Sequence, residues 1–205
     1  MMQVKNVNWI GLASGILLIA VILLSLYNPW WQLRIGDFVY ANFSPLSTNF
    51  SFLGITFLIP LLTAINISCL LLLSISAAVM IAYSVNPTKP YSKQLLCWSY
   101  KKPLTILITF IAAIVALSQL ASYLANQYAH IGLQLPIIGT SVIQVPSELL
   151  GELSGVQIGV AVSGGFQWTF YLAIAATGLC IATRILYSKA SFTSEPAANI
   201  TATSS

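Results

Sequence analysis

The stretch Tyr27-Asn28-Pro29-Trp30-Trp31-Gln32-Leu33-Arg34 stands where the first long apolar run of the chain ends. Two adjacent tryptophans between a proline and an arginine are typical of a membrane–water boundary, because an indole has an apolar body and a polar N–H. The preceding run, residues 9–27, carries no charge. At about 1.5 Å per residue it is long enough to cross a bilayer core of roughly 30 Å. The stretch therefore predicts a membrane helix followed by a connector beyond the membrane.

The composition excludes a soluble globular protein. The 205 residues are 58% hydrophobic and only 6% charged, whereas a soluble domain has about 25% charged residues. The net charge is +4, but no dense Lys/Arg cluster indicates a nucleic-acid partner. Cys69, Cys97 and Cys180 are too scattered for a metal-ligand pattern, and none lies in a segment that we expect outside the cell, so no disulfide framework is predicted.

The apolar runs predict a mainly α membrane protein with one domain over residues 1–190 and a disordered cytoplasmic tail at 191–205. The first run follows Lys5 and resembles a signal peptide, but it is longer than the usual apolar core and lacks a small-x-small cleavage site, so we expect an uncleaved anchor. The second run exceeds a bilayer, so it tilts, kinks near Pro60 or begins outside the membrane. The four predicted transmembrane helices are about 9–27, 55–83, 104–124 and 166–186.

The basic residues predict the orientation. Cytoplasmic loops collect Lys and Arg. With four spans, the N-terminus, a basic loop at 84–103 and the C-terminus share one side, and seven of the eight basic residues fall there, the exception being Arg34. We therefore expect a multi-pass protein of the cell membrane with both termini in the cytoplasm and two outer loops, 28–54 and 125–165. The seven residues are Lys5, Lys89, Lys93, Lys101, Lys102, Arg184 and Lys189.

The two outer loops contain strand-like patterns. Residues 31–43 and 49–57 are expected to form one hairpin around a turn at 44–49. Residues 141–145 and 156–162 are rich in β-branched residues, and the segment 146–153 between them fits a short helix with Ser147 as its N-cap. We expect the two loops to pair into one small extracytoplasmic β-layer. Asn42 and Asn49 both begin N-glycosylation patterns.

Small and polar residues within the runs indicate helix contacts. Gly11 and Gly15 form a GxxxG face, and Gly178 and Ala182 form a similar pair. A membrane-buried amide usually bonds to a neighbouring helix, so we assign Asn66 a structural role ahead of a ligand role. The strip of Ser118, Gln119 and Ser122 lines either a helix contact, the favoured interpretation, or a shallow cavity.

No ionisable residue lies in the middle of a predicted span, which counts against a proton-coupled transporter or an ion pump but not against a channel lined by hydroxyls and amides. His130, Glu148 and Glu152 have the chemistry for a metal or acid–base site, yet their spacing demands neither. Arg34 and Asp37, three apart in a presumed strand, are expected on opposite faces. No catalytic, cofactor-binding or metal-ligating residue is predicted, and no nucleotide-binding or hydrolase motif is present.

Four spans with both termini inside and tryptophans (Trp30 and Trp31) in the first outer segment resemble the claudin-type and tetraspanin-type membrane proteins in topology. The chain departs from both families. It lacks the G-L-W and paired cysteines of the claudin loop, and its 125–165 loop lacks the tetraspanin C-C-G. No functional residue is therefore carried over. The composition, rich in Ile, Leu, Ser and Tyr with few charges, is similar to that of membrane proteins of thermophilic archaea.

These patterns favour a non-enzymatic structural, assembly or adhesion subunit that acts through its outer loops and helix faces. Its expected partners are the lipid bilayer and other membrane proteins or further copies of itself, with no nucleic acid and no cofactor. The alternative is a small transporter or channel subunit whose polar, uncharged path includes Asn66, Gln119 and Ser122. A third hypothesis is a surface enzyme that uses His130 and the two glutamates.

Overall fold

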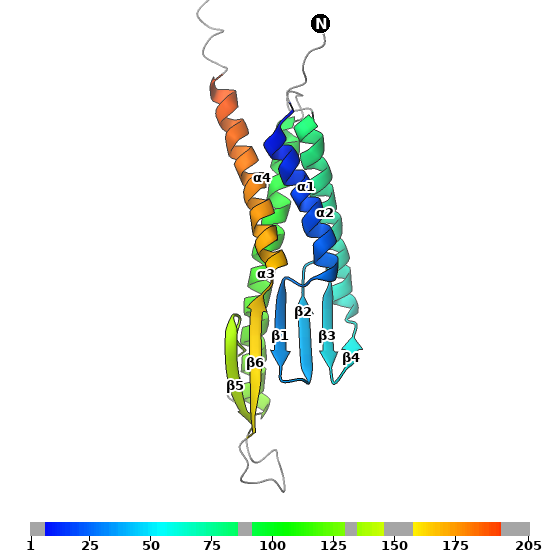
Figure 1. Cartoon of the computed structure of the whole chain (residues 1–205), viewed down its shortest axis with the longest axis vertical. Helices are drawn as coiled ribbons and strands as arrows, with labels where there is room; N and C mark the ends of the chain where they lie inside the picture. Colours follow the sequence, from blue (N-terminus) through cyan, green and yellow to red (C-terminus); the bar gives the residue numbers. More distant parts are fainter. Residues whose placement is uncertain (1–6, 86–91, 130–134, 146–157, 194–205) are drawn as a thin grey trace, which may run out of the picture.

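The computed structural model of the protein describes residues 7–85, 92–129, 135–145 and 158–193, which form a helix bundle with a β-sheet at one end (Figure 1). All four helices are long and apolar enough to cross a membrane, by length and composition. Both the first residue of α1 and the last of α4 lie at the end of the bundle opposite the sheet (Figure 1). The helices are α1 (Trp9–Tyr27), α2 (Pro60–Val85), α3 (Ser92–Ala129) and α4 (Trp168–Thr193).

Helix α1 packs closely against α2 through its two glycines. The side chain of Asn8 caps α1 by accepting a hydrogen bond from the amide of Gly11, at 3.1 Å. A Cβ atom on Gly15 would lie 2.6 Å from the side chain of Ile81 in α2, and one on Gly11 would lie 2.5 Å from the hydroxyl of Ser84. The GxxxG face thus brings two helices of this chain together. Gly178 of α4 has open space around it instead.

The observed helices differ from the bounds of the predicted spans at three places. Helix α2 begins at Pro60, and residues 55–57 form a strand. Pro60 does not kink α2, because a proline at the first helical position has no hydrogen bond to lose. Helix α4 runs on to Thr193, so the first residues of the expected tail are helical, whereas 194–205 lie outside the described residues.

The third boundary concerns α3, which is 38 residues long and starts within the predicted basic loop. Lys101, Lys102 and Pro103 are therefore helical. Leu96 and Ser99 are fully buried, and the Ser99 hydroxyl lies 3.7 Å from the sulfur of Met80 in α2. Packing against α2 extends the helix toward its N-terminus, an effect that local composition does not reveal.

The sheet confirms that the two connectors form one β-layer. Six antiparallel strands lie in the order β4-β3-β2-β1-β6-β5, and the two connectors meet where β1 pairs with β6. The strands are β1 (Trp31–Ile35), β2 (Val39–Phe43), β3 (Thr48–Phe52), β4 (Ile55–Phe57), β5 (Gly139–Val145) and β6 (Ile158–Phe166).

The first connector forms four strands where the sequence predicted one hairpin. Gly36 adopts a φ of 51° and Gly54 a φ of 80°, a left-handed conformation that glycine adopts without steric cost. Each glycine turns the chain inside a segment that we had expected to be one strand. Residues 146–153, the predicted short helix, lie outside the described residues.

The sheet has an apolar back and a polar front. Trp31, Leu33 and Val162 point to the back and are less than 9% exposed. The later part of α3 runs behind β5 and β6 (Figure 1). The Trp31 indole donates to the carbonyl of Ile137 at 2.7 Å, and the Ser118 hydroxyl of α3 donates to that of Leu135 at 2.9 Å. The segment before β5 thus links the sheet to α3.

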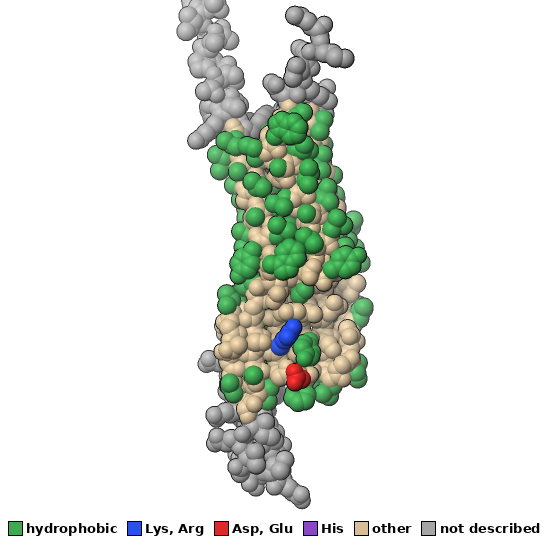
Figure 2. Space-filling view, viewed as in Figure 1, with side chains coloured by type: hydrophobic (Ala, Val, Ile, Leu, Met, Phe, Trp, Pro, Cys, Tyr) green, Lys and Arg blue, Asp and Glu red, His purple; other side chains and the backbone are tan. Residues whose placement is uncertain are grey.

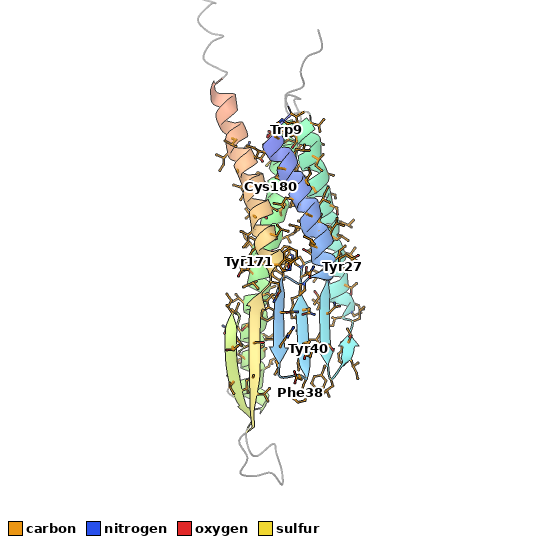
Figure 3. The ribbon with its side chains drawn as sticks, in the orientation of Figure 1. Trp9, Tyr27, Phe38, Tyr40, Tyr171 and Cys180 are labelled. Atoms are coloured by element: carbon orange, nitrogen blue, oxygen red, sulfur yellow. The ribbon has the colours of Figure 1, made fainter. Side chains whose placement is uncertain are left out.

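The two tryptophans of the opening stretch lie inside the protein. Trp30 is 2% exposed and folds back onto α1, where its indole N–H donates to the Ser25 hydroxyl at 2.7 Å. Its ring also meets Phe110 of α3 at 5.2 Å and Phe170 of α4 at 6.0 Å. The backbone of Trp30 hydrogen-bonds to Phe43 of β2 and to Gln167, the residue between β6 and α4, so Trp30 joins three helices to the sheet. The exposed aromatic residues at this level include Tyr27 and Tyr171 (Figure 3), and Trp168.

Candidate functional site: the polar face of the sheet

Polar side chains run in two rows across the front of the sheet. Residues that face each other on neighbouring antiparallel strands project to the same side. One row is Gln32, Asn42 and Asn49, in line with Gly165 of β6, and the other is Thr140, Ser163, Arg34, Tyr40, Ser51 and Thr56. Because both connectors contribute to each row, this surface exists only when the whole sheet has formed.

The charges of this face form one small cluster. The Arg34 guanidinium lies over the Tyr40 ring, 5.6 Å from its centroid, and the Tyr40 hydroxyl points at Asp37 with its oxygen 3.4 Å from Oδ1. In the view of Figure 2, basic and acidic atoms lie over the sheet, and none lie over the helices. We expected Arg34 and Asp37 on opposite faces, which was wrong, because β1 ends at Ile35 and the turn at Gly36 brings Asp37 back toward Tyr40.

A hollow of about 260 Å³ lies beside this cluster, where β1 pairs with β6. Across it the Gln167 amide donates to Oε1 of Gln32 at 3.2 Å. A Cβ atom on Gly165 would have no neighbour within 4 Å, so any larger side chain there projects into the hollow. The lining residues are Gln32, Arg34, Ser163, Gly164, Gly165 and Gln167.

Asn66 of α2 bonds to the first connector and not to another helix. With its amide oriented to suit its neighbours, it donates to the Pro45 carbonyl at 3.3 Å and accepts from the Thr48 amide at 3.1 Å. These bonds tie the start of α2 to β3. They satisfy the amide locally, as expected for a structural residue.

The strip of Ser118, Gln119 and Ser122 lines a second hollow of about 730 Å³. This hollow lies between α3 and the segment before β5. The strip therefore lines a shallow cavity, which was the less favoured of our two expectations for it. Asn66 does not line this hollow. The lining residues are Ser118, Gln119, Ser122, Asn126, Leu135, Ile137 and Ile138.

The remaining candidates form no site in the described part of the chain. His130, Glu148 and Glu152 lie outside the described residues. The cysteines at 69, 97 and 180 are all free thiols. Within the described ranges, no three His, Cys, Asp or Glu side chains gather where they could hold a metal ion.

No family model and no curated protein matches this chain.

The polar face was only partly visible in the sequence. The alternation in Trp31-Gln32-Leu33-Arg34-Ile35 predicts a strand with one polar side. The hollow also depends on β6 and on Gln167, which follows β6 and lies 135 positions from Gln32 in the sequence.

Proposed function

We propose that this protein is a non-enzymatic, multi-pass protein of the cell membrane that serves as an assembly or adhesion subunit. The sheet lies outside the cell and both termini lie in the cytoplasm. The four apolar helices support the membrane location. Lys101, Lys102 and Arg184 belong to the half of the bundle away from the sheet, which supports the orientation. The topology is like that of claudin-type and tetraspanin-type proteins.

The open polar face of the sheet carries this proposal. The later part of α3 lies behind β5 and β6, whereas no described segment covers the front of the sheet (Figure 1). The front offers mainly amides and hydroxyls, with Tyr40 and Arg34 near its centre. Tyrosine and arginine are among the residues that contribute most to protein–protein binding. A hydrogen-bonded sheet also presents them in fixed positions, which lowers the entropy lost on binding.

The test is photo-crosslinking in the native membrane with a benzophenone amino acid at Asn49, an exposed residue on the front of β3. We expect one major protein adduct. Adding the Arg34→Ala and Tyr40→Ala substitutions should lower its yield at least tenfold, since each anchor residue contributes about 1–2 kcal/mol or more. The matched control is Tyr171→Ala on α4, which is 59% exposed but lies off the sheet.

An adduct that persists in the Arg34/Tyr40 double variant would place the partner elsewhere. A clean monomer in mild detergent, together with the absence of any adduct, would reject the subunit hypothesis.

A second candidate function, a small transporter or channel subunit, is favoured by the hollow along α3. Gln119 and Ser122 line it, as this hypothesis requires, but Asn66 is bonded to β3. Solute flux into liposomes should then fall in a Gln119→Leu variant and not in an Asn66→Leu variant. Equal flux in the wild-type protein and the Gln119→Leu variant would dismiss this function.

A further inference from the structure

Helix α3 extends past the other helices and alongside the sheet. Phe110 lies 5.2 Å from the ring of Trp30, which stands three residues after the end of α1. The residues of α3 beyond Phe110 therefore lie at the level of the sheet. We call residues 111–124 the sheet-side half of α3; at about 1.5 Å per residue it is about 21 Å long.

The sheet-side half of α3 is exposed and apolar over most of its circumference. Only a narrow stripe, which includes Ile114 and Ser118, is buried against the protein. Residues 103–129 contain no charged side chain, and Gln119 is the one amide among residues 111–124. The large exposed apolar residues are Ile111, Val115, Leu117, Leu120 and Leu124.

The other end of α3 carries two lysines at a level where α1 is still apolar. Ser84 of α2 accepts a hydrogen bond from the amide of Asn8, which caps α1. Met80 is one turn deeper in the bundle, and Ser99 lies beside it at 3.7 Å. At about 1.5 Å per residue, Lys101 and Lys102 are thus about 10 Å inside the end of the bundle.

Lys102 turns back toward that end. Its ammonium lies 5.3 Å from the centroid of the Trp98 ring, one turn earlier in α3. A lysine that lies over a tryptophan in this way is typical of a side chain reaching for the membrane interface. The apolar part of α3 therefore begins at Pro103, well inside the apolar part of α1.

We propose that lipid covers the sheet-side half of α3, so that the plane of the bilayer is inclined to the axis of the helix bundle. Residues 103–124 span about 33 Å, close to the hydrocarbon thickness of about 30 Å. Lys102 and Trp98 mark one end, and Tyr123 and Asn126 mark the other. Because α1 and α3 each pack against α2 and α4, they occupy opposite corners of the bundle. The apolar, lipid-facing surface of the helices therefore reaches further toward the sheet on the α3 side of the bundle than on the α1 side.

Lipid fits this surface better than a protein partner does. A single partner helix covers one strip of a helix, whereas the exposed residues of the sheet-side half surround most of it. The polar front of the sheet remains in water, because it faces away from α3. This inference rests on the proposed membrane location but not on the proposed subunit role.

The test measures depth in liposomes of phosphatidylcholine and phosphatidylglycerol at a ratio of about 3:1, chosen to give an anionic surface. Cys69, Cys97 and Cys180 are replaced by alanine, and single nitroxide labels are placed at Ala113, Val115, Ile19 and Asp37. Ala113 and Val115 are exposed on the sheet-side half, Ile19 is exposed on α1, and Asp37 lies in the sheet turn. Oxygen collides preferentially with labels in lipid, and a nickel chelate collides with labels in water.

We expect the labels at Ala113 and Val115 to be as oxygen-accessible as the Ile19 label, and the Asp37 label to be nickel-accessible. Nickel accessibility at Ala113 and Val115 like that at Asp37 would overturn the proposal and leave α3 in water. Shielding of both labels from both reagents would also overturn it, because a protein would then cover α3. In either case a lipid-exposed Ile19 label would keep the membrane location, whereas a nickel-accessible Ile19 label would reject that location itself.

Discussion

Replacement of Trp30 by alanine should destabilise the protein more than removal of any exposed tryptophan. Trp30 is 2% exposed and is held by the bond to Ser25 and by the rings of Phe110 and Phe170. Truncation of a buried tryptophan costs about 3–5 kcal/mol. At roughly 2–4 °C per kcal/mol for a chain of this size, the midpoint of thermal unfolding should fall by about 6–20 °C.

Two further variants separate packing from hydrogen bonding. Trp30→Phe keeps an aromatic ring but removes the donor to the buried Ser25 hydroxyl, and should cost about 1–2 kcal/mol, or roughly 2–8 °C. Trp9→Ala is the matched control, because Trp9 is 74% exposed. Far-UV circular dichroism in mild detergent measures all three midpoints. Equal shifts for Trp30→Ala and Trp9→Ala would refute the view that Trp30 joins the helices to the sheet.

Three more substitutions can be measured by the same thermal unfolding. Gly15→Ala should lower the free energy of unfolding by about 1–3 kcal/mol, because its Cβ would press on Ile81. Its control, Gly178→Ala, should be neutral or slightly stabilising, since alanine favours a helix and the space is open. Equal midpoints for the two variants would contradict the close approach of α1 and α2. Gly164→Ala should be destabilising by a similar amount, because its Cβ would overlap the Pro136 carbonyl. Its control, Gly165→Ala, should change stability by less than about 0.5 kcal/mol. A larger loss of stability for Gly165→Ala than for Gly164→Ala would show that the back and front of β6 had been exchanged. Asn66→Leu should lower the free energy of unfolding by about 1–2 kcal/mol through the lost bonds to Pro45 and Thr48. Its control, Ser68→Ala, should have little effect, because the Ser68 hydroxyl bonds only within α2. An unchanged midpoint for Asn66→Leu would argue against the structural role of Asn66.

The sequence predicted the four helices and the β-layer because both signals are local. An uncharged run of sufficient length identifies a membrane helix with little help from the rest of the chain. The alternation of apolar and polar residues identifies β1 in the same way. Both signals depend on the spacing of side chains within one segment.

The pairing of the two connectors was predicted, but other features that depend on contacts between distant segments were not. The early start of α3 depends on Leu96 and Ser99 packing against α2. The burial of Trp30 depends on Phe110 and Phe170 closing around it. An indole at a helix end has the same local sequence whether it faces lipid headgroups or neighbouring helices, so composition alone cannot distinguish the two.

The central position of β1 in the sheet has a consequence for synthesis of the chain. β1 pairs on one side with β2, which follows it after a short turn, and on the other side with β6, which begins only at Ile158. While the ribosome is still making the third helix, one edge of β1 therefore has unpaired backbone N–H and C=O groups. β6 leads directly into α4, so that edge closes only as the last helix follows. The sheet is thus completed late in synthesis, and a chain that stops before β6 is left with an open, aggregation-prone strand.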